Sequence, residues 1–391
     1  MAAFSLLIGM RLKNIDFTLS LMASSLVLGF TAEKPLSIYT DAALKTFTDP
    51  TTFDLFAAVA LITLLGYILN ETGLMAETIE GLRGILSSRV LLSLIPALFG
   101  ILTMPGGALM SAPFNEPEAD RLKLSSEQKT YMNVWFRHVW FWASPISPTP
   151  ILAAALAGFT QREFLFAEMP LFAVSVAIGF VASRGFMGKP VEKGSASKDY
   201  RIVVKGLAPI AAVISLSLLG LPIWVALMLG IAMILIIKHV SLSAFMGFVR
   251  KGIRWDIAIA VVAMLYFRYL IIISGSVNAL LSNLLNQGIP LLLILVAVPV
   301  AVGVISATPT VGLAMAFPLL VPMCGNMSVY LAGFMYAGIV SGYLASPMHL
   351  CLVLTNGYYK SSLGKVYRYL VPSAIALYLA TGAYNLLMNG V

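Results

Sequence analysis

The chain has 391 residues, of which 59% are hydrophobic and 11% charged, and its mean hydropathy is +0.92. These values exclude a soluble globular domain and predict an all-α polytopic membrane protein embedded in a lipid bilayer. The formal net charge is +8, but the basic residues are scattered over short connecting segments rather than gathered in a stripe, which argues against a nucleic-acid partner.

Ten apolar segments are candidates for single membrane crossings. In chain order they are residues 2–12, 16–31, 52–70, 130–158, 163–186, 203–219, 221–240, 255–274, 327–356 and 366–389. The first segment is short, and we expect a clipped or late-started helix rather than a cleaved signal peptide, because no small-residue cleavage site follows it. Two further stretches, 89–114 and 289–322, are interrupted by Pro and Gly, and we expect each to form a re-entrant hairpin.

The distribution of Lys and Arg predicts the orientation of these segments, because basic residues accumulate in cytoplasmic loops. If both hairpins are re-entrant and every other segment crosses once, about twenty of the 25 basic residues lie on one side. The other side holds Lys34, Lys45 and Arg162, while Arg137 and Arg268 lie within spans. The sequence therefore predicts a multi-pass protein of the plasma or inner membrane with both termini outside, the first hairpin opening from the cytoplasm and the second from outside.

The two halves of the chain repeat one pattern at a separation of roughly 202 to 204 residues. The matches are Phe53-Asp54 with Trp255-Asp256, Gly73 with Gly275, Pro96 with Pro299, Gly100 with Gly303, Pro105 with Pro309, and Ala143-Ser144-Pro145 with Ala345-Ser346-Pro347. Five crossings per copy is an odd number, so the second copy must be inverted relative to the first. Secondary transporters follow this plan, and their substrate and coupling ion bind at discontinuous helices near the membrane midplane.

The segment 130–158 contains such a discontinuity in the run W-A-S-P-I-S-P-T-P. Three prolines and three hydroxyl residues occupy its centre, namely Ser144, Pro145, Ser147, Pro148, Thr149 and Pro150. Proline removes a backbone donor and clashes with the preceding turn, so a continuous helix is excluded here. In hydrocarbon the freed backbone groups must face protein or a water-filled cavity. The carbonyls that end the first half-helix suit a small cation, and the N-terminus near Ile151 suits an anion.

The hairpin tips and the second break, Ser346 to His349, extend the same chemistry, and we expect all four to converge on one polar site. The candidate substrate-binding residues are Thr103, Gly106, Gly107, Ser111, Ser144, Ser147, Thr308, Thr310, Ser346 and His349. The candidate coupling-ion residues are Pro105, Ser144, Thr149, Ser306, Thr308 and Ser346. Dipoles and hydroxyls would hold an anionic substrate, helped by a co-bound Na⁺ or H⁺.

Several charged or titratable residues have more than one interpretation. Arg137 and His138 lie within a span and carry a possible charge role, or Arg137 snorkels among interfacial aromatics. His349 carries a coupling proton, bonds the substrate, or packs between helices. Asp54 and Asp256 recur at the start of a span, and we interpret them as helix caps in preference to an ion site.

The two cysteines, Cys324 and Cys351, form no CxxC and no Cys/His cluster of metal-ligand spacing. The sequence therefore predicts no disulfide, no cofactor and no metal centre other than a possible Na⁺ site.

The inverted repeat, with a hairpin and a Ser-Pro break in each half, resembles the ion transporter superfamily. That group includes divalent-anion/sodium symporters, gluconate permeases and arsenite-carrier-like proteins. The run M-P-G-G-A-L-M-S-A-P looks most like an uncharacterised integral-membrane family within it. The dicarboxylate carriers of the group have Ser-Asn-Thr triplets at their hairpin tips and helix breaks. This chain has no such triplet, so its expected site differs from a dicarboxylate site.

The resemblance implies an elevator-type carrier that works as a homodimer. The scaffold would comprise residues 1–87 and 203–287, the moving block residues 88–186 and 288–391, and a cytoplasmic linker residues 187–202.

We therefore expect a secondary active transporter of a small, anionic organic solute, coupled to Na⁺ or H⁺, with Na⁺ favoured because no acidic residue lies at the predicted midplane. An inorganic-ion or cation/proton antiporter is the first alternative. An intramembrane lipid-handling protein is the second. An enzyme is not expected, because the chain has no GxSxG, HExxH, paired midplane carboxylates or Walker motif.

Overall fold

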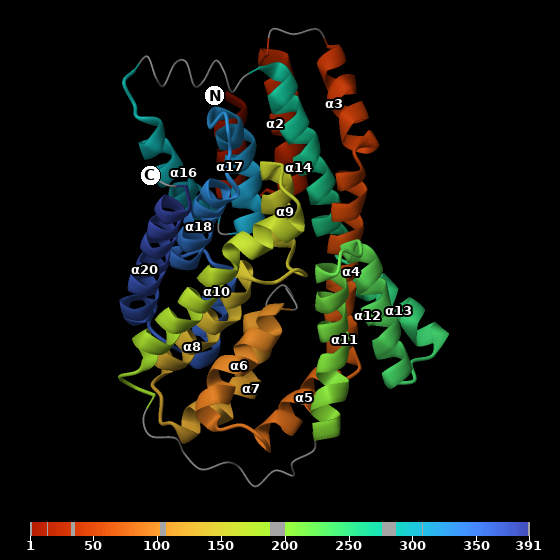
Figure 1. Ribbon diagram of the computed structural model, residues 1–391, viewed down its shortest axis with the longest axis vertical. Coiled ribbons are helices and arrows are strands. Elements are labelled where there is room, and N and C mark those ends of the chain that lie inside the picture. Colours follow the sequence, from red (N-terminus) through yellow and green to blue (C-terminus); the bar gives the residue numbers. More distant parts are fainter. Residues whose placement is uncertain are drawn as a thin grey trace.

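Helices account for every element in the part of the chain that the structure describes (Figure 1). The structure is a computed structural model that describes residues 2–13, 15–32, 36–101, 107–187, 200–275, 287–306 and 308–389. Six helical stretches there are long and apolar enough to cross a membrane, namely Pro50–Glu71, Gln161–Ser183, Tyr200–Leu218, Trp255–Ser274, Val329–Tyr359 and Leu363–Asn389. The chain is thus built as a multi-pass α-helical membrane protein, and the expected ten crossings stay a prediction.

Several helices of the first half begin at recognisable caps. They are α1 (Ala2–Leu12), α2 (Phe17–Thr31), α3 (Ser37–Thr48), α4 (Pro50–Glu71), α5 (Leu74–Arg83), α6 (Ser88–Ile101), α7 (Gly107–Arg121), α8 (Ser126–His138), the 3-10 helix η1 (Val139–Trp142), α9 (Pro148–Ala157) and α10 (Gln161–Ser183). Asp49 caps α4 by accepting a hydrogen bond from the Thr51 amide at 2.9 Å, with proline at the first position. Capping boxes begin α8 and α10.

The helices of the second half follow in the same order. They are α11 (Tyr200–Leu218), α12 (Ile223–Ile237), α13 (Leu242–Gly252), α14 (Trp255–Ser274), α16 (Leu291–Ser306), α17 (Pro309–Met323), α18 (Val329–Ala345), α19 (Leu350–Tyr359) and α20 (Leu363–Asn389). The short helices α3, α5 and α13 were not expected from the sequence, because they are too short to span a bilayer and all three carry charged residues.

Both expected helix breaks are present. α8 tightens into η1, and the chain then runs without helix over residues 143–147 before α9 begins at Pro148. In the second half α18 ends at Ala345, one residue before Ser346-Pro347, and α19 begins at Leu350. The proline rings and missing amide donors account for both interruptions.

One expectation about a helix cap is wrong. α4 begins at Pro50 with Asp49 as its cap, so Asp54 lies one turn inside the helix. Asp256 does lie in the first turn of α14, where Arg254 donates to both of its carboxylate oxygens at 2.9 and 2.6 Å.

Unusual backbone conformations recur at matching places in the two halves. Positive φ angles occur at Gly73 and Gly275, at Lys123 and Gly325, and at Gly158 and Lys360, and each pair lies 202 residues apart. Close approaches recur as well: a Cβ at Gly100 would overlap the carbonyl oxygen of Arg137, and one at Gly303 would overlap that of Ile339.

The helices contact one another in two groups. The α4–α14 group comprises α1 to α5 with α11 to α14, and the α8–α18 group comprises α6 to α10 with α16 to α20. In Figure 1 α8, α10, α18 and α20 lie on one flank, whereas α4, α11, α12 and α13 lie on the other. The groups meet mainly where α4 contacts α9 and where α14 contacts α17, so the helix breaks and the second hairpin lie at the boundary.

Candidate functional site

A cavity of about 480 Å³ lies between the two helix groups, and we call it the Thr149 cavity. One wall comes from α2, α4 and α14, and includes Leu55, Val59 and Val261. The opposite wall comes from α6, α8, η1, α9, α17, α18 and α19. A small organic solute fits this volume, which lies in the usual range for ligand pockets.

Three helices of the α8–α18 group begin at this cavity. Thr149 of α9, Thr310 of α17 and Cys351 of α19 are each the second residue of their helix, and all three line the cavity. None of these helices has a side-chain hydrogen bond at its N-cap, and the first ladder bonds are donated by Ile151, Gly312 and Val353. The second-residue amides therefore have no hydrogen-bond partner among the described residues. Exposed amides and the positive ends of three helix dipoles together favour an anion.

Charged and aromatic side chains complete the lining. Arg137 is buried, and its guanidinium donates to the carbonyl of Phe99 in the first hairpin at 2.8 Å. His138 and Tyr343 lie beside it, and the Nε2 of His138 is 3.3 Å from the Tyr343 hydroxyl. On the opposite wall Arg254 is ion-paired with Asp256. Arg137 therefore belongs to the cavity wall, and the hydrogen bond to the Phe99 carbonyl holds its guanidinium in place.

The structure brings some of the expected site residues to this cavity and places others elsewhere. Those that line it are Arg137, His138, Thr149, Thr308 and Thr310. Those that belong to the breaks or hairpins without lining it are Ser111, Ser144, Ser147, Ser306, Ser346 and His349. Thr103, Pro105 and Gly106 lie outside the described residues, and Gly107 is the first residue of α7. The two threonines beside the Pro309 turn thus join the first break at one site.

The serines of the two breaks differ in their bonding. Ser346 donates to the carbonyl of Val304 at 2.7 Å and accepts from the Met348 amide at 3.2 Å, which ties the second break to α16. Ser144 and Ser147 are buried, but their hydroxyls have no hydrogen-bond partner among the residues that the structure describes. An unpartnered buried hydroxyl carries a desolvation cost that a bound ion would relieve. The first break therefore keeps two oxygens for a small cation.

Ser111 and Ser306 have structural partners. The Ser111 hydroxyl donates to Oδ1 of Asn133 at 2.8 Å, and that of Ser306 donates to the Thr308 carbonyl at 3.1 Å. The amide nitrogen of Asn133 donates to the Ala108 carbonyl at 2.8 Å and to the Thr355 hydroxyl at 3.3 Å. Asn133 thus joins α7, α8 and α19 beside the site.

The comparisons with known proteins add a family. A model of the family described as "Protein of unknown function (DUF401)" matches residues 1–387. The chain belongs to the DUF401 family. No curated protein matches it.

Sequence reasoning missed two buried polar residues in this DUF401 chain. The first is Asn133, and the second is Glu168 of α10. The side chain of Glu168 is buried against Gly333 of α18, and its Oε2 has no hydrogen-bond partner among the described residues. Both lie within apolar segments, where an ionisable or amide side chain is a candidate functional residue by default. Glu168 is the eighth of the 23 residues of α10, so it lies before the middle of that span, and the absence of an acidic residue at the midplane stays a prediction.

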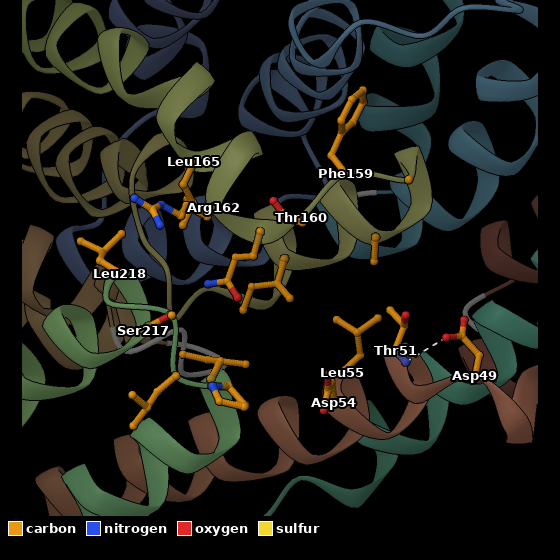
Figure 2. A pocket seen from close by; sticks show the side chains of 18 of the residues that line it. Asp49, Thr51, Asp54, Leu55, Phe159, Thr160, Arg162, Leu165, Ser217 and Leu218 are labelled. Atoms are coloured by element: carbon orange, nitrogen blue, oxygen red, sulfur yellow. Dashed lines mark hydrogen bonds between the residues drawn. The ribbon is translucent and has the colours of Figure 1, made fainter.

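A second cavity, of about 640 Å³, lies on the other side of the contact between α4 and α9, and we call it the Asp54 cavity. Figure 2 shows Asp54 and Leu55 on α4 facing Thr160 and Arg162, which lie where α10 follows α9. Leu55 lines both cavities. Because turns and charged side chains make up much of its lining, the Asp54 cavity has the character of a solvent vestibule between the helix groups.

Proposed function

We propose that this DUF401 protein is a secondary active transporter that moves a small anionic organic solute through the Thr149 cavity. The observation that carries the proposal is the meeting of three uncapped helix N-termini, from α9, α17 and α19, at one cavity of solute size. Arg137 adds a positive charge to the same wall. Discontinuous helices whose N-termini point at an anion are a recurring solution in secondary transporters.

The matching backbone features of the two halves support an inverted-repeat carrier. Positive φ angles and close glycine contacts recur 202 to 203 residues apart, at the ends of corresponding helices and at the hairpin-to-break contacts. In the proposed elevator mechanism the α8–α18 group moves against the α4–α14 group, with the Thr149 and Asp54 cavities on either side of the contact between α4 and α9. A homodimer through the α4–α14 group, with both termini outside, is part of this proposal.

Two ions are candidates for coupling. Na⁺ is supported by the unpartnered hydroxyls of Ser144 and Ser147 at the first break. H⁺ is supported by the buried carboxyl of Glu168. The two ions can be distinguished by mutation. Variants of Ser144 or Ser147 would lose the Na⁺ dependence of uptake, whereas variants of Glu168 would lose its pH dependence.

Ligand-dependent thermal stability of the purified protein tests the proposal. Carboxylates, sugar acids, amino acids and oxyanions are screened in Na⁺ and in K⁺, and we expect one anion class to raise the midpoint of unfolding. At a ligand concentration 100 times Kd the stabilisation is about 2.7 kcal/mol, which is a shift of several degrees. Uptake of that anion by proteoliposomes should then require an Na⁺ or H⁺ gradient.

Matched variants test the site itself. Thr308→Ala and Ser144→Ala should impair uptake without loss of folding, whereas Thr40→Ala and Ser243→Ala, at exposed positions of α3 and α13, should not. Wild-type uptake by both Thr308→Ala and Ser144→Ala would remove this site from consideration.

An inorganic-ion or cation/proton antiporter is the second candidate, favoured by Glu168 and by the carboxylate of Asp256 at the cavity wall. That candidate predicts that no organic anion stabilises the protein, whereas Na⁺ alone or a change of pH does.

A further inference from the structure

Two histidines and a cysteine from different halves of the chain meet beside the Thr149 cavity. His138 ends α8, His349 immediately precedes α19, and Cys351 is the second residue of α19. All three residues are buried, and one ligand atom from each lies within 4.8 Å of the others. The imidazole rings of His138 and His349 have their centroids 4.8 Å apart at an interplanar angle of 76°. No other group of metal-binding side chains of this kind is found among the described residues.

The hydrogen bonds of the two histidines leave nitrogen atoms for a further ligand. The Nδ1 of His138 is 2.6 Å from the carbonyl oxygen of Val134, so this nitrogen carries the proton, and the lone pair of Nε2 faces the Tyr343 hydroxyl at 3.3 Å, a contact that a metal ion would replace. A backbone carbonyl on the second ring nitrogen is the usual support of a metal-binding histidine. Neither nitrogen of His349 has a hydrogen-bond partner within 3.5 Å among the described residues, although the side chain is fully buried. Such an unpartnered ring in an interior requires a partner that the protein itself does not supply.

The donor set selects the kind of partner. Two imidazoles and one thiolate suit Zn²⁺ or Cu⁺ and do not suit Na⁺, Mg²⁺ or Ca²⁺, which prefer oxygen. Zinc–ligand bonds of roughly 2.0–2.3 Å place the ligand atoms of a tetrahedral site roughly 3.3–3.8 Å apart. Side-chain movements of about 1 Å would therefore close the observed cluster around an ion. A thiolate at the second residue of α19 also interacts favourably with the positive end of that helix.

We propose that His138, His349 and Cys351 bind one Zn²⁺-class ion at the wall of the Thr149 cavity. His138 and Cys351 line the cavity, so the fourth coordination position faces it and is open to a water molecule or to an anion. The ion joins α8 of the first half to α19 of the second, and its positive charge offsets that of the Cys351 thiolate. Metal binding does not depend on the transport proposal, because it is measured without solute and without a membrane gradient.

Cobalt is the probe, because Co²⁺ replaces Zn²⁺ and reports its ligands by its absorption spectrum. Chelator-stripped, reduced protein in detergent is titrated with Co²⁺, and we expect one ion per chain, tetrahedral d–d bands and a thiolate-to-cobalt charge-transfer band, all abolished by added Zn²⁺. Cys351→Ser should remove the charge-transfer band. His349→Ala should weaken Co²⁺ affinity by at least about 100-fold, since loss even of an outer-shell partner costs roughly 10–100-fold.

The chain supplies a matched control for each variant. Cys324 is the other cysteine, at the end of α17, and His239 is the third histidine, exposed after α12. Cys324→Ser and His239→Ala should bind Co²⁺ as the wild type does. His349→Gln provides a second test should His349→Ala elute as aggregate.

A wild-type protein without a charge-transfer band at saturating Co²⁺ would overturn the metal proposal, as would loss of the band in Cys324→Ser. Either result leaves anion binding untouched, and a failure of every anion to stabilise the protein would equally leave the cobalt spectrum untouched.

Discussion

At Gly100 and Gly303 the packing of the helices decides whether substitution by alanine lowers or raises the stability of the protein. Gly100 of α6 touches the backbone carbonyl of Arg137, and Gly303 of α16 touches that of Ile339. Alanine at either position would place Cβ on a carbonyl oxygen that no side-chain rotation can move. The helices must then separate by roughly 1 Å or more to restore van der Waals contact.

The magnitude follows from two opposing terms. Overpacking of this kind costs typically about 1–3 kcal/mol, and more where backbone opposes backbone. Alanine returns about 1 kcal/mol through its higher helix propensity. We expect a net loss of about 2 kcal/mol for Gly100→Ala and for Gly303→Ala, which lowers the midpoint of thermal unfolding by roughly 2–3 °C. Gly100 and Arg137 also line the Thr149 cavity, so Gly100→Ala should reduce stabilisation by the anion.

Gly247 is the matched control, because it lies in α13 and a Cβ added there would meet nothing within 4 Å. Gly247→Ala should leave the midpoint unchanged or raise it, which is the opposite sign for the same chemical change. The assay is intrinsic-fluorescence thermal unfolding of the three variants in one detergent. Midpoints of Gly100→Ala and Gly303→Ala at or above that of the wild type would refute the close packing of hairpin against broken helix.

Three further predictions concern buried polar groups. Ser346→Ala should lower the free energy of unfolding by about 1–3 kcal/mol, because it leaves the Val304 carbonyl unpaired. Ser144→Ala should leave that free energy almost unchanged, since the Ser144 hydroxyl has no partner among the described residues. A lower thermal midpoint for Ser144→Ala than for Ser346→Ala would contradict this prediction. Asn133→Leu should cost at least about 3 kcal/mol, because it removes bonds to Ala108, Ser111 and Thr355, and a wild-type unfolding midpoint would show that this network is not needed. Glu168→Gln should raise the unfolding midpoint at alkaline pH, because it replaces a buried carboxyl with a neutral amide; if H⁺ is the coupling ion, proteoliposome uptake by this variant should also lose its pH dependence, and an unchanged pH profile would exclude Glu168 as the proton carrier.

Much of the helical framework could be predicted from the sequence, because apolar length and proline act locally. The span expected at 255–274 coincides with α14, and both Ser-Pro triplets lie at real breaks. The short helices α3, α5 and α13 could not be predicted in this way. Their stability comes from contacts with α4, α11 and α14 rather than from a spanning length of apolar residues.

The site was predicted less completely. The threonines of the breaks and tips were expected at one place, and Thr149, Thr308 and Thr310 do line one cavity. Ser346, in contrast, is used to hold α16, a role that depends on which carbonyl comes within reach after packing. An Asn or Glu inside an apolar segment is a signal that the sequence does contain, and it would have found Asn133 and Glu168.

By itself the sequence determined that the chain is a multi-pass α-helical membrane protein and where prolines interrupt two of its helices, because these properties depend on residues close together in the chain. The tertiary structure alone decided which helix ends face the same cavity, and that His138 meets His349 and Cys351. Those contacts join opposite halves of the chain, so no spacing along the sequence encodes them, and they arise only when the broken helices pack against each other.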